Sequence, residues 1–483
     1  MAKDLIKGAN PFMPLWEHVP DGEPRVFEYN GEKRLYVYGS HDKDPTKWCS
    51  DDYVVWSAPL DDLTDWTCHG VCYKAADEKN RLCAPDVVQK GDMFYLYASE
   101  WGNTLTTVSK SPCPYGPFTD TVPTKIGEDV GVLVDDDGRV YAYWGYALAQ
   151  CVELEEDMAT FKEGTYRCNF IGHCRIDFRP HDEHEIPEDG FFEAASPRKI
   201  NGKYVFVYSK RTGKYVPEYG ANAASTMLLS YQYSDHPLEG YQRGGDISYN
   251  CGELITLSDG TVGQTYPEGN NHGGLVDIGG QWYVFYHRQT GGLGGFGDNY
   301  SGRQAMLEPV DVAMDKDGRV FIGKITYENG EPVACGPVEM TSQGPHLNGI
   351  DAYKLISAGY TCHISGDRSA YVYTVHGDTS MKEVSVRRIR TGTTVGFRYL
   401  QFGDSPAKRV SLWGKALCDV TVNLRIDMHQ GPVVATLSLK AGDTSAAADL
   451  NIPLTAKHAV YFEFLGAKEQ ELAVFYQFTF DHE

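Results

Sequence analysis

Two carboxylates in this sequence stand in surroundings that suit opposite halves of an acid–base reaction. Glu193 follows two phenylalanines in FFEAAS, the second of them Phe192. An apolar wall raises a carboxyl pKa, so Glu193 is a candidate proton donor. Asp21 lies in VPDGEP, between proline and glycine, and is a candidate for the ionised partner. A donor and a base on opposite sides of a pocket are the minimum for cleaving a glycosidic bond.

A third carboxylate, Asp86 in CAPDVV, could orient the donor and keep its pKa high through like charge. Each of these residues alone has a plain structural explanation, since an aspartate in a Pro-Asp-Gly stretch is usually turn chemistry. Their recurrence at matched places in a repeat is what favours catalysis.

The repeat consists of five segments with a glycine-containing turn and a following strand of alternating Tyr, Phe and Val. They are NGEKRLYVYGS, KGDMFYLYAS, DDGRVYAYWG, NGKYVFVYS and GGQWYVFYHR. Such turns between alternating apolar residues are a strong hairpin signal. One ionisable residue precedes the turn in each unit: Asp21, Asp86, Asp129, Glu193 and His272. The pattern predicts a five-bladed β-propeller whose first strands line a common channel.

Length and composition predict an all-β protein of two domains. The chain has 483 residues, more than one hydrophobic core usually serves. Its 12% aromatic residues and 51 glycines favour strands and turns over helices. We expect the propeller at residues 1–338, a linker at 339–352, and a β-sandwich of jelly-roll type at 353–483, where short strand patterns resume.

Charge and hydropathy limit which classes of partner and which location the sequence favours. The formal net charge is −22, without a Lys/Arg-rich segment, which excludes nucleic acid and anionic membranes as expected partners. The N-terminus lacks an apolar run of signal-peptide length, so we expect a cytoplasmic protein. A secreted protein whose leader has been removed is the alternative. The sequence does not indicate an oligomeric state.

Six motifs, in order over about residues 10 to 325, resemble glycoside hydrolase family 43: VPDGEPRVF, CAPDVV, EDVGVLVDDDGRVYAYWG, FFEAASPRKINGKYVFVYS, NNHGGLVDIGGQWYVFYHR and GRQAMLEPV. The resemblance implies a five-bladed propeller that hydrolyses arabinofuranosides or β-xylosides with inversion. Carried over by position, it implies Asp21 as general base, Glu193 as general acid and Asp86 as the residue that tunes the pKa of the acid. Cys83 is a departure, because the family often has Trp before Ala-Pro-Asp.

The same resemblance assigns further site residues. Arg303 in SGRQA matches an arginine that contacts sugar hydroxyls, and Phe192, beside the acid, would also contact the substrate. His272 matches a histidine near the propeller axis that commonly helps bind calcium or another ion, often through water. From the residues alone, His272 is more simply a polar core side chain. No organic cofactor is expected.

These residues together predict an exo-acting, inverting glycosidase that removes terminal α-L-arabinofuranosyl residues from hemicellulose or arabinan oligosaccharides. A β-D-xylosidase and a glycan-binding propeller without catalysis are the alternatives. Inversion requires the carboxyls of Asp21 and Glu193 to lie about 6.5 to 9.5 Å apart, because a water must fit between base and sugar.

Three other features are less specific. The C-terminal sandwich weakly resembles carbohydrate-binding module family 6, and Trp413, Tyr399 or Tyr461 could stack on a sugar; we expect packing instead. Residues 168–185 gather Cys and His without the paired spacings of a zinc site. The glycine-rich residues 290–302 are expected to form a mobile loop at the mouth of the pocket.

Overall fold

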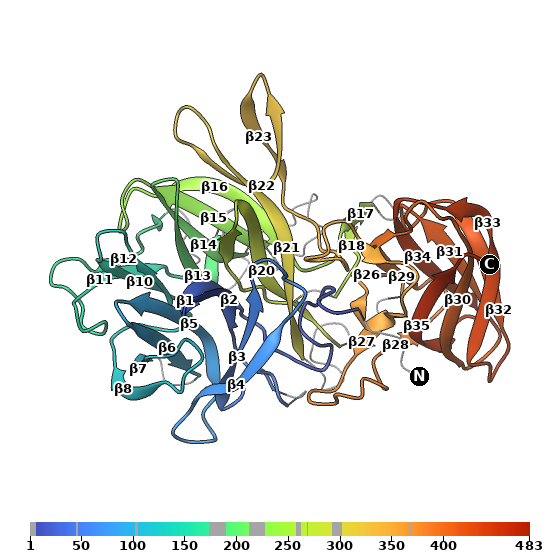
Figure 1. The fold of residues 1–483 in the computed structure, drawn as a ribbon, viewed down its shortest axis with the longest axis horizontal. Coiled ribbons are helices and arrows are strands. Elements are labelled where there is room, and N and C mark those ends of the chain that lie inside the picture. Colours follow the sequence, from blue (N-terminus) through green and yellow to red (C-terminus); the bar gives the residue numbers. More distant parts are fainter. Residues whose placement is uncertain are drawn as a thin grey trace, which may run out of the picture.

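The computed structural model describes residues 6–44, 47–101, 105–172, 190–211, 228–256, 262–267, 269–291, 302–367 and 369–483. Most of residues 168–185 and 290–302 therefore lie outside the described residues. Nearly all the regular elements of the described chain are β-strands, and they form two bodies side by side, one blue to yellow and one orange to red (Figure 1). No helix in these ranges is long and apolar enough to cross a membrane.

Five antiparallel sheets make up the first body, the predicted five-bladed β-propeller. Four of them have four strands each: β1 (Glu23–Tyr29), β2 (Glu32–Tyr38), β3 (Asp52–Pro59) and β4 (Thr67–Lys74); β5 (Leu82–Lys90), β6 (Met93–Glu100), β7 (Thr106–Ser111) and β8 (Thr119–Pro123); β9 (Gly131–Val134), β10 (Val140–Trp144), β11 (Gln150–Leu154) and β12 (Arg167–Cys168); β13 (Gly190–Ile200), β14 (Lys203–Arg211), β15 (Leu228–Ser234) and β16 (Gln242–Tyr249).

The fifth sheet has five strands: β19 (Leu275–Ile278), β20 (Gln281–Gln289), β21 (Arg303–Met314), β22 (Val320–Glu328) and β23 (Glu331–Gly336). Its last two strands project away from the propeller as a hairpin (Figure 1). A separate short pair, β17 (Leu254–Thr256) and β18 (Val262–Gln264), lies between the fourth and fifth sheets in sequence.

All five predicted hairpins are confirmed, and each is the first pair of strands in its sheet. In the first, Asn30 and Gly31 both have positive φ, 52° and 80°. This is the turn that matches the twist of the flanking strands, and Asn-Gly is the dipeptide that adopts it at low cost. Turn chemistry thus fixes the register of the strand that approaches the propeller axis.

The first strands contact one another around the axis, β1 with β5 and β19, and β9 with β5 and β13. A buried ion network fills the space between them. Arg25 donates to both carboxylate oxygens of Asp86, at 3.0 and 2.6 Å, and Arg198 lies 2.6 Å from Glu23. Removing one partner of a buried pair leaves an uncompensated charge. These pairs therefore fix the first strands of three blades relative to one another.

The second body is a sandwich of two six-stranded sheets. One contains β24 (Ile350–Asp351), β26 (His363–Ser365), β29 (Thr394–Gln401), β31 (Val420–Ile426), β32 (Val433–Leu439) and β34 (Lys457–Gly466); the other contains β25 (Ile356–Ser357), β27 (Tyr371–Tyr373), β28 (Ser385–Ile389), β30 (Ala407–Ala416), β33 (Ser445–Leu454) and β35 (Ala473–Asp481). Phe462 of one sheet packs on Phe478 of the other, with ring centroids 4.8 Å apart. A 3₁₀ turn, η3 (Ala358–Tyr360), follows β25.

The segment predicted as a linker, 339–352, runs between β23 and the sandwich. Ile350 and Asp351 of this segment form β24, which pairs with β29. The jelly-roll connectivity stays a prediction.

The two domains share one apolar core. Arg288 of β20, fully buried, donates to the carbonyls of Thr361 and Gly359 in the sandwich. The Tyr360 hydroxyl donates to the carbonyl of Ile6 at 3.0 Å. Such contacts favour the packing role predicted for the sandwich. Tyr461 is 1% exposed, which excludes it from stacking on a sugar in this state.

Candidate active site

The predicted site residues converge where the first strands of the blades begin. Asp21 directly precedes β1, His272 precedes β19, and Arg303 opens β21. Glu193 lies on β13 between two register shifts of the β13–β14 pair. A bulge re-aims side chains and is common beside active sites, which places the Glu193 carboxyl at this end of the ring.

Asp21 is held as an anion. Its side chain is buried, and it accepts hydrogen bonds from Arg303 Nη1 at 3.0 and 3.2 Å and from Ser40 Oγ at 2.6 Å. Burial raises the pKa of this carboxyl, but the charge of Arg303 and the neighbouring histidines outweigh burial and lower the pKa to about 2. A carboxylate that is ionised throughout the neutral range can act as a general base.

His287 orients the loop that carries Asp21, a role the sequence analysis did not assign. Its Nδ1 accepts the backbone N–H of Asp21 at 3.2 Å, and its Nε2 lies 2.8 Å from the carbonyl of Asn270. Burial lowers the pKa of His287 to about 3. The imidazole is therefore neutral, with its proton on Nε2, because Nδ1 must accept.

Arg303 is committed to protein partners. Its Nε and Nη2 bond to Asp42 at 2.9 and 3.1 Å, while Nη1 bonds to Asp21. It is 2% exposed. The structure thus shows Arg303 as the cation that holds the base in place, and its predicted contact with sugar hydroxyls stays a prediction.

Glu193 is in the opposite electrostatic state. Burial, followed by the negative charge of Asp21, raises its pKa to about 7. Within the described part of the chain, its carboxyl accepts a long hydrogen bond from Asn270 Nδ2, at 3.5 Å. Beside it, Phe192 is half-buried and packs edge-on against Tyr146 with ring centroids 5.1 Å apart. A carboxyl with a pKa near neutrality can donate a proton under the conditions in which Asp21 accepts one.

Asp129 is the carboxylate next to Glu193. Its Oδ2 accepts the backbone N–H of Ala194 at 3.3 Å, directly after the acid. Burial and the charge of Glu193 raise the pKa of Asp129 to about 8. Two carboxyls in one site cannot both ionise readily, so the ionised Glu193 raises the pKa of Asp129.

Asp86 lies in the ion network between the first strands of the blades. Its carboxylate takes a bidentate bond from Arg25 and the backbone N–H of Val132 at 2.6 Å, within the ion network of the channel. Because the guanidinium offsets its charge, Asp86 is poorly suited to raise the pKa of Glu193. Asp129, which bonds to the residue after Glu193, is the better-placed candidate for the modulator, and the assignment of Asp86 stays a prediction.

His272 stands between two carboxylates of the site. Its Nδ1 lies 4.0 Å from Asp21 Oδ1 and 3.8 Å from Asp129 Oδ2. Both distances exceed a hydrogen bond. The predicted metal role of His272 stays a prediction.

Comparison with known proteins identifies the fold that carries this site. The model of glycosyl hydrolases family 43 matches residues 21–319, from Asp21 to the start of the last hairpin. The chain belongs to glycosyl hydrolase family 43. This family 43 enzyme is 29% identical to a xylosidase/arabinosidase of Thermoclostridium stercorarium, over 96% of this chain and 98% of the relative.

Two further relatives of the family 43 enzyme are similar over nearly its full length. An arabinoxylan arabinofuranohydrolase of Paenibacillus polymyxa is 23% identical over 94% of this chain and 72% of that protein. A crystal structure of a family 43 arabinoxylan arabinofuranohydrolase from Bacillus subtilis, in complex with cellotetraose, superposes with a TM-score of 0.47 at 19% identity, covering 99% of this chain and 98% of that one.

Proposed function

We propose that this glycoside hydrolase is an exo-acting, inverting α-L-arabinofuranosidase, with β-D-xylosidase as the second candidate. One observation carries the proposal: Asp21 and Glu193 belong to one site and their pKa values are displaced in opposite directions, to about 2 and about 7. The names of the relatives, xylosidase/arabinosidase and arabinoxylan arabinofuranohydrolase, support both sugars.

In the proposed reaction Glu193 donates its proton to the leaving oxygen as the glycosidic bond breaks. Asp21 removes a proton from the water that attacks the anomeric carbon from the opposite face. Asp21 then releases its proton to solvent, and solvent reprotonates Glu193. Burial and the negative charge of Asp21 keep Glu193 protonated near neutral pH.

Calcium is the ion that the family resemblance implies for His272. Calcium prefers six to eight oxygen ligands, and His272 presents a nitrogen between two carboxylates at 3.8 and 4.0 Å. This donor set fits an ion held through water. A cation there would favour the ionised forms of Asp21 and Asp129.

The sugar is tested with 4-nitrophenyl α-L-arabinofuranoside and 4-nitrophenyl β-D-xyloside. Faster release from the arabinoside supports the first candidate, and faster release from the xyloside supports the second. No release from either, together with measurable affinity for arabinoxylan oligosaccharides, would favour a glycan-binding protein.

Stereochemistry is tested by proton NMR on a fresh arabinoside. The anomer opposite to the substrate should appear first, before mutarotation mixes the two. Initial retention would contradict a water held between two carboxyls.

A further inference from the structure

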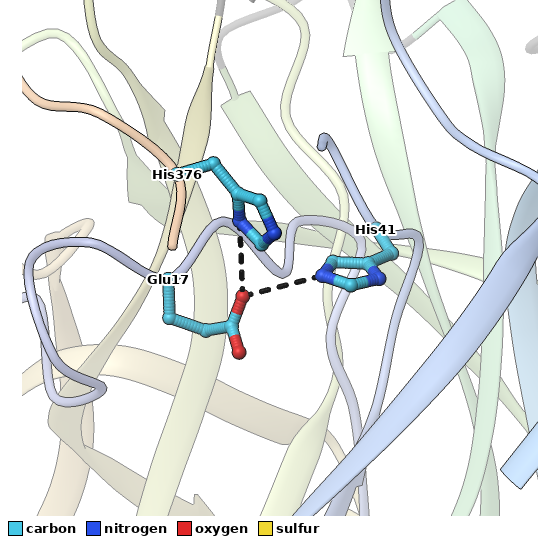
Figure 2. A group of neighbouring side chains, drawn as sticks. All are labelled: Glu17, His41 and His376. Atoms are coloured by element: carbon cyan, nitrogen blue, oxygen red, sulfur yellow. Dashed lines mark ion pairs between the residues drawn. The ribbon is translucent and has the colours of Figure 1, made fainter. Parts of the chain in front are cut away.

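A second cluster of chemically competent side chains lies at the boundary between the domains. It consists of Glu17, before β1, His41, after β2, and His376, after β27 of the sandwich (Figure 2). Their donor atoms all lie within 4.8 Å of one another. We propose that these three residues bind a transition-metal ion of the Zn²⁺ class, which links the sandwich to the propeller.

The nitrogens of both histidines face the same carboxylate oxygen. Glu17 Oε1 lies 3.3 Å from His41 Nε2 and 3.5 Å from His376 Nδ1 (Figure 2). Neither nitrogen has a hydrogen-bond partner of acceptable geometry among the described residues, although His41 is only 5% exposed. A buried imidazole nitrogen aimed at a carboxylate without a proper hydrogen bond calls for a third partner.

Two of the three separations between the donor atoms match a tetrahedral ion, and the third is no longer than 4.8 Å. Zn–N and Zn–O bonds of about 2.0–2.2 Å give ligand–ligand separations of roughly 3.3–3.5 Å in a tetrahedron. The two distances to Glu17 Oε1 already have these values. Calcium is disfavoured because two of the three ligands are nitrogens, whereas calcium takes oxygen. The chemistry therefore differs from that implied for His272.

The groups behind the ligands fix their orientation. His41 Nδ1 lies 2.6 Å from Asp52 Oδ1, an arrangement in which Nδ1 donates and Nε2 keeps its lone pair for a metal. Trp56 Nε1 donates to Glu17 Oε2 at 3.2 Å, and the backbone N–H of His18 donates to Oε1 at 3.0 Å. The His376 side chain is 20% exposed, which leaves a side open for a water as the fourth ligand.

The position gives such an ion a structural consequence. His41 stands between Ser40, which donates to Asp21, and Asp42, which holds Arg303. An ion on His41 and His376 would tie the loop that positions the base to the sandwich. Two hydrogen bonds already join the domains beside it, from Gly377 N–H to the Trp16 carbonyl at 3.1 Å and between His18 Nε2 and Thr374 Oγ1 at 2.8 Å.

The competing explanation is a metal-free ion pair. A His41 imidazolium could bridge Asp52 and Glu17 without a metal, because both its nitrogens face carboxylates. The metal-free ion pair does not use His376 as a metal ligand. The two explanations therefore differ in whether replacing His376 lowers the affinity for zinc.

The test uses the full chain, stripped with a chelator and titrated with Zn²⁺ by calorimetry, with metal content measured after dialysis. We expect one equivalent of zinc, at least a 100-fold loss of affinity in His376→Ala, and a 10- to 100-fold loss in Asp52→Asn. His458→Ala is the matched control, since His458 lies in the same domain at 24% side-chain exposure beside Asp427. His272→Ala should also keep its zinc, which separates this site from the axis.

Cobalt gives a readout that does not depend on catalysis or on stability. Co²⁺ in place of Zn²⁺ should give the intense visible absorption of a tetrahedral site in the wild type and His458→Ala, and lose it in His376→Ala. Zinc uptake far below one equivalent in the wild type would overturn the proposal whether or not a variant folds. Equal uptake by wild type and folded His376→Ala would also overturn it.

Discussion

At the scale of single residues, the site separates two carboxyls by what surrounds them. Asp21 faces a guanidinium and a serine hydroxyl, and Glu193 faces other carboxyls and apolar surface. The general acid and general base follow from these surroundings, since both side chains carry the same functional group.

The choice between Asp86 and Asp129 as the modulator of Glu193 gives a paired prediction. Asp129→Asn should shift the alkaline limb of the kcat/KM profile and reduce it to a single ionisation, that of Glu193, because Asp129 and Glu193 otherwise titrate as a pair. Asp86→Asn should leave the position of that limb unchanged. A shift in Asp86→Asn and none in Asp129→Asn would favour the original assignment.

The protonation of Glu193 also affects stability. Its folded pKa of about 7 lies above the ordinary glutamate value of 4.5, so its protonated form stabilises the native state below pH 4.5, and this contribution is lost as pH rises through 7. Glu193→Gln should therefore have a higher Tm than the wild type at pH 8 and a similar Tm at pH 4.5. An equal or lower Tm at pH 8, measured by calorimetry, would contradict a raised pKa.

The sequence contains a spacing that distinguishes Asp129 from Asp86. Asp129 and Glu193 each lie nine residues before the turn glycine of their hairpin, whereas Asp86 lies only five before Gly91. Asp86 is therefore further along its strand, where Arg25 meets it. By contrast, no local sequence pattern predicts Arg303 as the partner of Asp21, since 282 residues separate the two.

At the scale of elements, the close approach of first strands brings Asp129 and Glu193 together. Gly131, the first residue of β9, has no room for a side chain: an added Cβ would lie 2.3 Å from the Ala195 carbonyl and 2.4 Å from Pro197 Cδ. Glycine here allows the third and fourth blades to meet beside the catalytic carboxyls.

Gly131→Ala should therefore destabilise the protein by about 2–4 kcal/mol, since overpacking against backbone cannot relax cheaply. It should also lower kcat by separating Asp129 from Ala194. Gly245→Ala is the control, because its added Cβ meets only Tyr231 at an ordinary 3.7 Å. Equal effects of the two substitutions, in chemical denaturation and in kcat, would remove this role from Gly131.

Hairpins were the elements most readily predicted from the sequence. Asn-Gly and aromatic alternation are local signals, and local signals report local structure. Contacts between distant segments determine the order of strands outside each hairpin and the placement of η3 against β20. Such contacts have no local sequence pattern.

At the scale of the whole molecule, contacts with the sandwich stabilise the propeller. The core of Leu15, Tyr266 and Tyr286 continues into Tyr360 and Ile364 without a break. Among the described residues, the carbonyls that accept hydrogen bonds from Arg288 belong to the second domain.

A chain ending at residue 338 should therefore be insoluble or have a Tm at least 10 °C below that of the full chain. It would expose that core and leave the Arg288 guanidinium without its carbonyl partners. Solubility and thermal unfolding of the two chains measure this directly. A truncated chain with the Tm and kcat of the full chain would show that the shared core is dispensable.

The most direct test of the account measures kcat/KM against pH for the wild type and Glu193→Gln, on whichever 4-nitrophenyl glycoside is hydrolysed faster. We predict that wild-type kcat/KM falls as pH rises through about 7, because Glu193 loses its proton, and that Glu193→Gln loses this alkaline limb while retaining part of its activity on the activated leaving group. The same alkaline limb in both proteins would contradict the assignment of Glu193 as the acid.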